Sequence, residues 1–224
     1  MSSVRTVFIH GVGRSGEAAW PTQAAHSCDD WLFLDRESEG DDPERDARRL
    51  SELISEEPVI LAAHSYGAIA ALLLTQRSPE LVRALILFEP ACLDLARGVS
   101  EVEDEIARMS PVMTAARDPS VSDLAYSGLF AEASGLPAPE MPAEVLEAEA
   151  ARLRALAPPW DTQLDRTAGV PVPTVVVTSG ASAPYEAVAT ALVERGAQHL
   201  IVSGSGHRPQ DVTDVTALID LVLR

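Results

Sequence analysis

The stretch VILAAHSYGA, residues 59–68, predicts a buried strand that turns at once into a helix. Its apolar first half suits a strand, and a single serine stands where the chain must reverse. A serine at such a tight turn is held in a strained conformation, so the residues two positions to either side must be small. Ala63 and Gly67 occupy those positions, with alanine in place of the first glycine of the usual GxSxG pattern. Ser65 is therefore the candidate nucleophile.

Length and charge restrict the class of protein. A chain of 224 residues with 46% apolar content suits one globular α/β domain, residues 1–224, with a sizeable core. Its formal net charge of −17 repels phosphate backbones and anionic membrane surfaces, so we expect neither nucleic-acid nor membrane partners. Cys28 and Cys92 are too few for a disulfide framework, and no secretory signal or membrane-spanning run is evident. We expect a cytoplasmic protein.

Short β-branched runs alternate with stretches of helical period along most of the chain, as in successive βαβ units. This alternation predicts an α/β fold, a mostly parallel sheet of about six strands with helices on both faces. The expected strands are residues 4–9, 31–35, 58–63, 84–89, 173–178 and 199–202. The expected helices are residues 16–27, 43–56, 66–77, 184–195 and 209–223.

Residues 92–171 interrupt this alternation with acidic, alanine-rich helical patterns at 99–109 and 142–156 and with loop signals at 135–139. We expect a helical insertion over the carboxyl edge of the sheet, where open α/β sheets bind ligands. The alternative is that the insertion is a solvent-exposed helical segment that contacts no functional site. The large apolar residues of the insertion more often pack in a core than line a pocket, and they indicate at most a substrate with a modest apolar acyl or aryl group. These residues include Met109, Met113, Tyr126, Leu129, Phe130, Met141 and Trp160.

A glycine-rich loop follows the first predicted strand. The amides of Val12 and Tyr66 could together hold a developing oxyanion, with His10, Gly11 and His64 flanking the substrate, and Trp160 of the insertion is a further substrate-binding candidate. The same loop contains GxGxxG at residues 11–16, typical of dinucleotide binding. That alternative leaves the serine turn and a late histidine unexplained, and acid-rich sequence follows the second strand.

The late histidine is His207, in the loop SGSGH that follows the last predicted strand. A serine hydroxyl is a weak nucleophile until an imidazole accepts its proton. The glycines around His207 give the loop freedom to bring the ring to Ser65. His207 is therefore the candidate general base.

Three motifs in this order resemble the α/β-hydrolase superfamily, in particular its compact members with a helical cap: HisGly at 10–11, the turn at 63–67 and Gly206-His207 before the terminal helix. The resemblance spans nearly the whole chain. It implies a mostly parallel sheet with helices on both faces and a nucleophile that precedes the histidine. Because the HisGly strand begins near residue 4, we expect about six strands and not the eight of the full family sheet, which has two leading strands.

The acid of the catalytic triad departs from the commonest family pattern. In most relatives an aspartate follows the strand after the cap, but here that strand runs into SGASAP, without a carboxylate. Relatives similar to haloalkane dehalogenases carry the acid one strand earlier, at the end of the strand that follows the nucleophile turn. This chain has Glu89 at that position. Asp94 and Glu186 are weaker candidates. The dehalogenases and epoxide hydrolases use aspartate at the nucleophile position, so Ser65 argues against both activities.

These residues predict a serine hydrolase of a small ester, thioester or related carbonyl compound, acting through an acyl-enzyme. Ser65 attacks, His207 moves the proton and Glu89 orients His207. No cofactor or metal is expected. Carbon–carbon hydrolysis, a lyase or cofactor-free oxygenase reaction on the same fold, and non-hydrolytic binding of a small ligand remain alternatives. The sequence indicates neither the substrate nor the oligomeric state.

Overall fold

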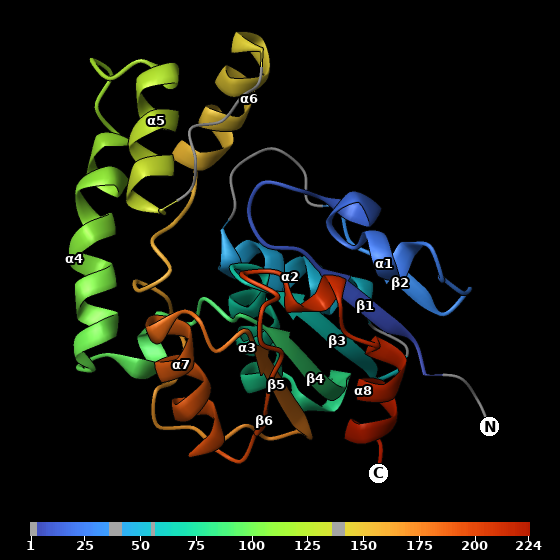
Figure 1. Ribbon diagram of the computed structural model, residues 1–224. Helices are drawn as coiled ribbons and strands as arrows, with labels where there is room; N and C mark the ends of the chain where they lie inside the picture. The colour runs from blue at the N-terminus through green and yellow to red at the C-terminus, as the bar shows by residue number, and fades with distance from the viewer. Residues whose placement is uncertain (1–3, 36–41, 55–56, 136–141) are drawn as a thin grey trace.

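Six parallel strands form one sheet at the centre of the molecule (Figure 1). The computed structural model describes residues 4–35, 42–54, 57–135 and 142–224. The strands lie in the order β2-β1-β3-β4-β5-β6, and every neighbouring pair is parallel. Their bounds are β1 Thr6–Ile9, β2 Trp31–Phe33, β3 Val59–His64, β4 Val82–Phe88, β5 Thr174–Thr178 and β6 Gln198–Ile201. The predicted fold class and strand number are confirmed.

Helices cover both faces of this sheet. The α-helices are α1 Pro21–Ala24, α2 Pro43–Leu53, α3 Gly67–Arg77, α4 Ser100–Ala115, α5 Asp123–Ala133, α6 Ala143–Arg154, α7 Ala183–Val193 and α8 Val215–Val222. Short 3₁₀ turns are η1 Gly16–Ala19, η2 Pro79–Leu81, η3 Leu93–Ala96 and η4 Pro209–Asp211. Helices α2, α3 and α7 pack on one face, and η1 and α8 pack on the other.

Alternate residues of the central strands bury their side chains on opposite faces. Leu61 of β3 belongs to the core under α2, α3 and α7, whereas its neighbour Ile60 packs with Trp20 and α8. Both are fully buried, as expected for a parallel strand covered on two sides. This double burial explains why residues 59–63 are continuously apolar.

Two predicted helices are broken. Residues 16–27 form η1 and then α1, which are separated at Trp20 because Pro21 starts a new helix. Residues 209–223 form η4 and then α8, whose N-terminus is capped by the Asp214 carboxylate accepting from the amides of Thr216 and Ala217. Helix-period apolar spacing continues across both breaks, so periodicity alone predicted one helix in each place.

The insertion also differs in detail from expectation. Helix α4 continues to Ala115, six residues beyond its predicted end, and α5 was not predicted. The loop signals at 136–139 and residue 56 lie outside the described residues. Figure 1 shows α4, α5 and α6 grouped together to one side of the sheet. We call these three helices the cap.

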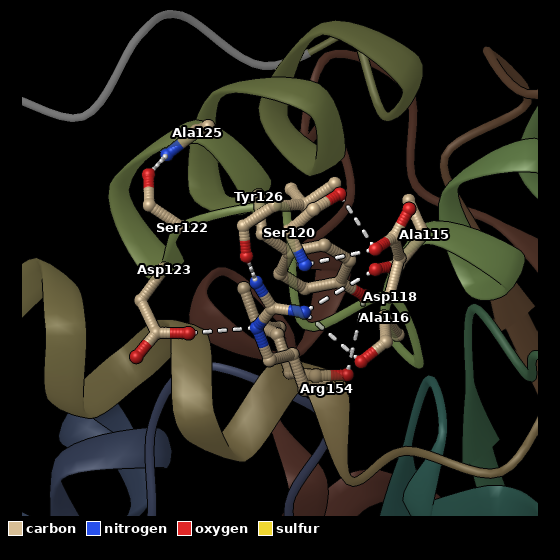
Figure 2. A network of polar contacts seen from close by, with 11 residues as sticks. Ala115, Ala116, Asp118, Ser120, Ser122, Asp123, Ala125, Tyr126 and Arg154 are labelled. Atoms are coloured by element: carbon tan, nitrogen blue, oxygen red, sulfur yellow. Dashed lines mark hydrogen bonds and ion pairs between the residues drawn. The ribbon is translucent and has the colours of Figure 1, made fainter.

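Arg154, at the end of α6, joins the three cap helices (Figure 2). Its guanidinium pairs with Asp123 at 2.7 Å and donates to the carbonyl oxygens of Ala115, Ala116 and Val121. The same group lies 4.6 Å from the centre of the buried Tyr126 ring. A planar cation with several donors can hold the ends of two helices and their connection in one arrangement. The cap therefore has its own polar centre beside a small apolar cluster.

Residues 155–173, between α6 and β5, lead the chain back from the cap, and we call them the return segment. Asp94 connects this segment to the sheet domain. Its carboxylate accepts from the amide of Thr162 at 2.8 Å and from the Thr162 hydroxyl. The Tyr66 hydroxyl donates to the carbonyl oxygen of Ala157 at 2.8 Å, on the same return segment.

Within the described ranges, no helix combines the length and apolar character needed to cross a bilayer.

The closest backbone approach beside the serine turn requires a glycine. A Cβ on Gly67 would lie 2.4 Å from the carbonyl oxygen of His10 and 2.9 Å from Ile9 Cγ2. We expect Gly67→Ala to lower the free energy of unfolding by about 1–3 kcal/mol, because backbone must move to make room. Denaturant unfolding followed by circular dichroism measures it.

Gly128→Ala is the matched control. Gly128 is also helical, in α5, but a Cβ there meets nothing within 4 Å. Alanine in an open helical position gains up to about 1 kcal/mol over glycine. Equal stability of the two variants would contradict the close approach at Gly67.

Candidate active site

Ser65 lies in a strained turn at the carboxyl end of β3, immediately before α3. Its φ of 52° places a non-glycine residue in the left-handed region. Its amide donates to the Phe88 carbonyl at 2.9 Å and its own carbonyl accepts from the amide of Ala91 at 3.1 Å. These bonds to the end of β4 hold the turn in place. Strained residues of this kind concentrate at functional sites.

The His207 ring reaches Ser65 from the loop after β6. Its Nε2 lies 3.0 Å from the Ser65 Oγ. The loop is fixed by His64, whose Nε2 lies 2.8 Å from the carbonyl oxygen of His207; because a carbonyl only accepts, that nitrogen carries a proton. Arg208 adds a second anchor, donating to Asp211 and to the carbonyl oxygen of Ala19. Ser65 and His207 therefore meet although 142 residues separate them.

Glu89 lies on the other side of the imidazole, at the end of β4. Its Oε2 is 4.0 Å from His207 Nδ1, and its Oε1 accepts from the Ser179 amide at 2.6 Å. Oε2 has no hydrogen-bond partner in the described part of the chain and is fully buried. Among the described non-glycine residues, Glu89 and Ser65 alone have positive φ, 42° and 52°. The carboxylate is thus held facing the imidazole as a buried acceptor.

The other two acid candidates are engaged elsewhere. Asp94 binds Thr162 on the return from the cap. Glu186 accepts from the Gly180 amide at 3.2 Å and lies 3.7 Å from His199 Nε2. Among the interactions of the described residues, Glu89 pairs with His207, and neither Asp94 nor Glu186 does.

Val12 and Tyr66, the expected oxyanion pair, both line the cavity that contains Ser65. Tyr66 stands at the N-terminus of the 11-residue α3, where the helix dipole favours negative charge. Gly11 allows the close approach, since a Cβ there would lie 2.9 Å from Ser65 Cβ and 3.0 Å from His64 Nδ1.

A cavity of about 520 Å³ opens between the cap and the carboxyl edge of the sheet. Its floor contains Ser65, His207 and Glu89, and its far wall is largely apolar. The cap and its return segment contribute Met109, Met113, Phe130, Leu153, Leu156 and Trp160 to that wall. Such a cavity has the size and lining of a small-molecule site.

The predicted substrate-contacting residues fall into two groups. His64 and Trp160 line the cavity, whereas His10 and Gly11 are not among the residues that line it. The His10 Nδ1 lies 2.7 Å from the Gly11 carbonyl oxygen. Of the apolar cap residues singled out from the sequence, Tyr126 packs in the cap and Leu129 is exposed, while Met141 lies outside the described residues.

Tyr185, in the first turn of α7, belongs to the site but was not predicted. It lines the cavity, and its ring centre lies 4.9 Å from that of His207. The only sequence signal is its place a few residues after β5, at the sheet edge where the other site residues gather.

The glycine loop at 11–16 leads into η1 and the four-residue α1, not into the long crossover helix of a dinucleotide site.

Desolvation lowers the pKa of both central histidines, even though the His207 side chain is 45% exposed. Surroundings of low polarity, with a smaller effect of the Arg208 charge, lower the pKa of His207 to about 4. Burial, followed by the charge of His207, lowers the pKa of His64 well below its usual value. Burial also raises the pKa of Glu89, opposed by its hydrogen bonds from Ser179. A neutral imidazole can accept the serine proton.

Metal chemistry has no assembled ligand set in the described ranges. No group of three or more histidine, cysteine, aspartate or glutamate side chains is placed there to hold a metal ion.

The chain belongs to the alpha/beta hydrolase family, whose model matches residues 6–218. MenH from S. aureus is 18% identical, with a TM-score of 0.68 over 98% of this chain and 93% of that one. A Bacillus megaterium epoxide hydrolase is 14% identical, with a TM-score of 0.64 over 100% and 94%. A thermophilic esterase from Thermogutta terrifontis is 17% identical, with a TM-score of 0.60 over 99% and 90%. No curated protein sequence matches significantly.

Likeness at these identities establishes the fold and leaves the chemistry to the site. The structural neighbours carry differently named activities on the same architecture. In this chain the site is built on the serine that follows β3 and the glutamate that follows β4.

The low pKa of His207 can be measured directly. We expect its imidazole to titrate near pH 4, far below the ordinary value of about 6.5, so that the ring is neutral from pH 5.5 upward. NMR of histidine-labelled protein follows the titration, and His207→Gln assigns the resonance. A midpoint at or above 6.5 would show that the ring is well solvated or strongly paired with an ionised Glu89.

Proposed function

We propose that this protein is a serine hydrolase that cleaves a small ester, thioester or related carbonyl compound through an acyl-enzyme. The observation that carries the proposal is the 3.0 Å contact between Ser65 Oγ and His207 Nε2 at a serine of positive φ. Nucleophile, base and a third, orienting group together are the pattern of covalent acyl transfer.

The first step transfers the acyl group to Ser65. His207 accepts the hydroxyl proton while Ser65 Oγ bonds to the substrate carbonyl carbon, and the carbonyl oxygen gains negative charge. The amides of Val12 and Tyr66, with the N-terminus of α3, would stabilise that oxyanion. The protonated His207 then gives its proton to the departing alcohol or thiol.

The second step releases the acid. Water, deprotonated by His207, attacks the acyl carbon, and Ser65 leaves with the proton that His207 returns. The buried Glu89 stabilises the imidazolium in both steps, since its unpartnered Oε2 faces Nδ1. Because the two atoms are 4.0 Å apart, a small approach is needed to form a hydrogen bond.

The substrate that fits best carries an apolar acyl or aryl group. Methionine and phenylalanine side chains of the cap, together with Trp160 of the return segment, line the cavity that contains Ser65. The net charge of −17 disfavours polyanionic substrates.

The second candidate is a protein that binds a small ligand without hydrolysing it. The 4.0 Å separation between Glu89 and His207 favours this alternative, because it exceeds the length of a hydrogen bond. Carbon–carbon cleavage would use the same groups and differs in its products.

Ser65 should react with a fluorophosphonate probe. We expect stoichiometric labelling of the folded protein at Ser65, detected by peptide mass spectrometry, because His207 activates that hydroxyl. Ser65→Ala should abolish labelling and lower ester hydrolysis by about 10³-fold or more.

A panel of p-nitrophenyl esters and thioesters of increasing acyl length supplies the activity measurement. Heat-unfolded protein is the control for non-specific labelling. Absence of labelling in folded wild-type protein, with no turnover of any ester, would contradict the hydrolase and favour the binding alternative.

Glu89→Gln tests the unusual position of the acid. We expect kcat to fall by about 10²- to 10⁴-fold, since glutamine keeps an acceptor for Ser179 but cannot stabilise the imidazolium. Glu186→Gln, which changes a nearby carboxylate that does not contact His207, is the matched control and should change kcat less than threefold. Equal activity of Glu89→Gln and wild type would exclude Glu89 as the triad acid.

A further inference from the structure

The loop that carries His207 is rich in glycine and largely exposed. Gly204 and Gly206 have positive φ values of 81° and 57°, and the His207 side chain is itself partly exposed. Glycines give a chain conformational freedom, so burial alone does not fix the position of this ring. The short distance between His207 and Ser65 therefore depends on contacts that the loop makes with other parts of the fold.

Arg208, the residue directly after His207, connects this loop to residues 19–23, which we call the brace. Its Nη2 donates to the carbonyl oxygen of Ala19 at 2.7 Å. Its Nε and Nη2 also donate to the two carboxylate oxygens of Asp211, at 2.5 and 2.8 Å. Because the guanidinium is planar and bonded on two sides, it has one orientation relative to the brace.

Two side chains of the brace donate in the opposite direction. Thr22 Oγ1 donates to the carbonyl oxygen of Asp211 at 2.8 Å. Gln23 Nε2 donates to the carbonyl oxygen of Gln210 at 2.7 Å, and both glutamines are buried. The segment after His207 is thus bonded to the brace at three points, across sequence separations of 187 to 189 residues.

Trp20 anchors the brace to the strand end that carries Glu89. Its buried ring meets the ring of Phe88 in β4 edge-on, with ring centres 5.8 Å apart. Phe88 directly precedes Glu89, and its carbonyl oxygen accepts from the amide of Ser65. The brace therefore connects the loop of His207 to the residue that also supports the nucleophile and the acid.

We propose that Arg208 is a positioning residue that, through the brace, holds the His207 ring between Ser65 and Glu89. The inference rests on the proposed serine hydrolase function. Neither Arg208 nor any residue of the brace is among those that line the cavity, so Arg208 acts through His207 and not on the substrate. Reacting groups must be held by such supporting bonds, since small displacements cost much of the rate.

Arg208→Gln removes the ion pair and the bond to the brace. We expect kcat for a p-nitrophenyl ester to fall about 10- to 100-fold, because the imidazole loses its alignment in both steps. KM should stay unchanged, because the lining of the cavity is kept. The rate of fluorophosphonate labelling at Ser65 should fall with kcat, since both reactions need the activated hydroxyl.

Two features of the assay isolate the positioning effect. Measurement at pH 8 keeps the imidazole neutral in every variant, so loss of the positive charge beside His207 does not alter its protonation. Rates are expressed per site labelled after prolonged incubation with the probe, so misfolded protein does not affect them.

Two milder variants test the same connection. Arg208→Lys keeps a positive charge and a donor but not the planar fork, so its kcat should lie between those of Arg208→Gln and the wild type. Thr22→Val removes one bond of the brace at the surface, with little change in shape, and should lower kcat about two- to tenfold at unchanged KM.

Arg77→Gln is the matched control. Arg77 also makes a bidentate ion pair, with Glu44 at 2.6 and 2.8 Å, but this pair joins α3 to α2 and neither residue lines the cavity. Its kcat should be within twofold of the wild type.

Two outcomes would overturn the inference. One is a kcat per labelled site of Arg208→Gln within twofold of the wild type. The other is a rise in KM at constant kcat, as expected of a residue that acts on substrate binding. If the wild type labels at Ser65 and Arg208→Gln is unaffected, the protein remains a serine hydrolase whose histidine loop needs no brace. If the wild type neither labels nor turns over any ester, the hydrolase fails, and this inference with it.

Discussion

The reversal of the chain at Ser65 is the constraint on which the site depends. It brings α3 so close to the end of β1 that a Cβ on Gly67 would lie 2.4 Å from the His10 carbonyl oxygen. The parallel pairing of β1 with β3, in register at Ile9 and Ala63, holds both strand ends in that position. The nucleophile and the loop with the Val12 amide are therefore positioned by the same contact. Strain at Ser65 persists because well-packed, fully buried strands surround it.

The acid after β4 is compatible with this architecture because β4 and β5 are neighbours. Phe88 pairs with Val177, so the residues just beyond the two strands, Glu89 and Ser179, lie side by side. The Ser179 amide donates to Glu89, and the β5 end supports the carboxylate. A carboxylate can thus reach the histidine loop from either strand. Desolvation in the cavity lowers the pKa of His207 and raises the pKa of Glu89, so it favours the neutral form of both side chains.

The strands of the sheet were predictable from strong local patterns, whereas several helices were predicted wrongly or missed. Central strands are buried on both sides, so their continuous apolar runs stand out in the sequence. Helices 16–27 and 209–223 were predicted as single segments, because the breaks at Trp20 and Asp214 arise from a proline and a capping carboxylate within an unbroken apolar period. Helix α5 was missed, and its place in the cap depends on Arg154, 31 residues from its partner Asp123. Tyr185 was missed because its partners are distant in sequence.

The sequence by itself determined the fold class, because strand and helix patterns alternate along it. It also indicated the candidates Ser65 and His207 through residue types at strand ends, and Glu89 through its strand-end position and the resemblance to a family. The tertiary structure decided which candidates meet. It put Ser65 Oγ 3.0 Å from His207 Nε2, turned Glu89 and not Asp94 or Glu186 toward the imidazole, and placed Tyr185 and the apolar cap wall around them. These outcomes depend on contacts between segments that are far apart in the chain, and local residue patterns carry no information about such distances.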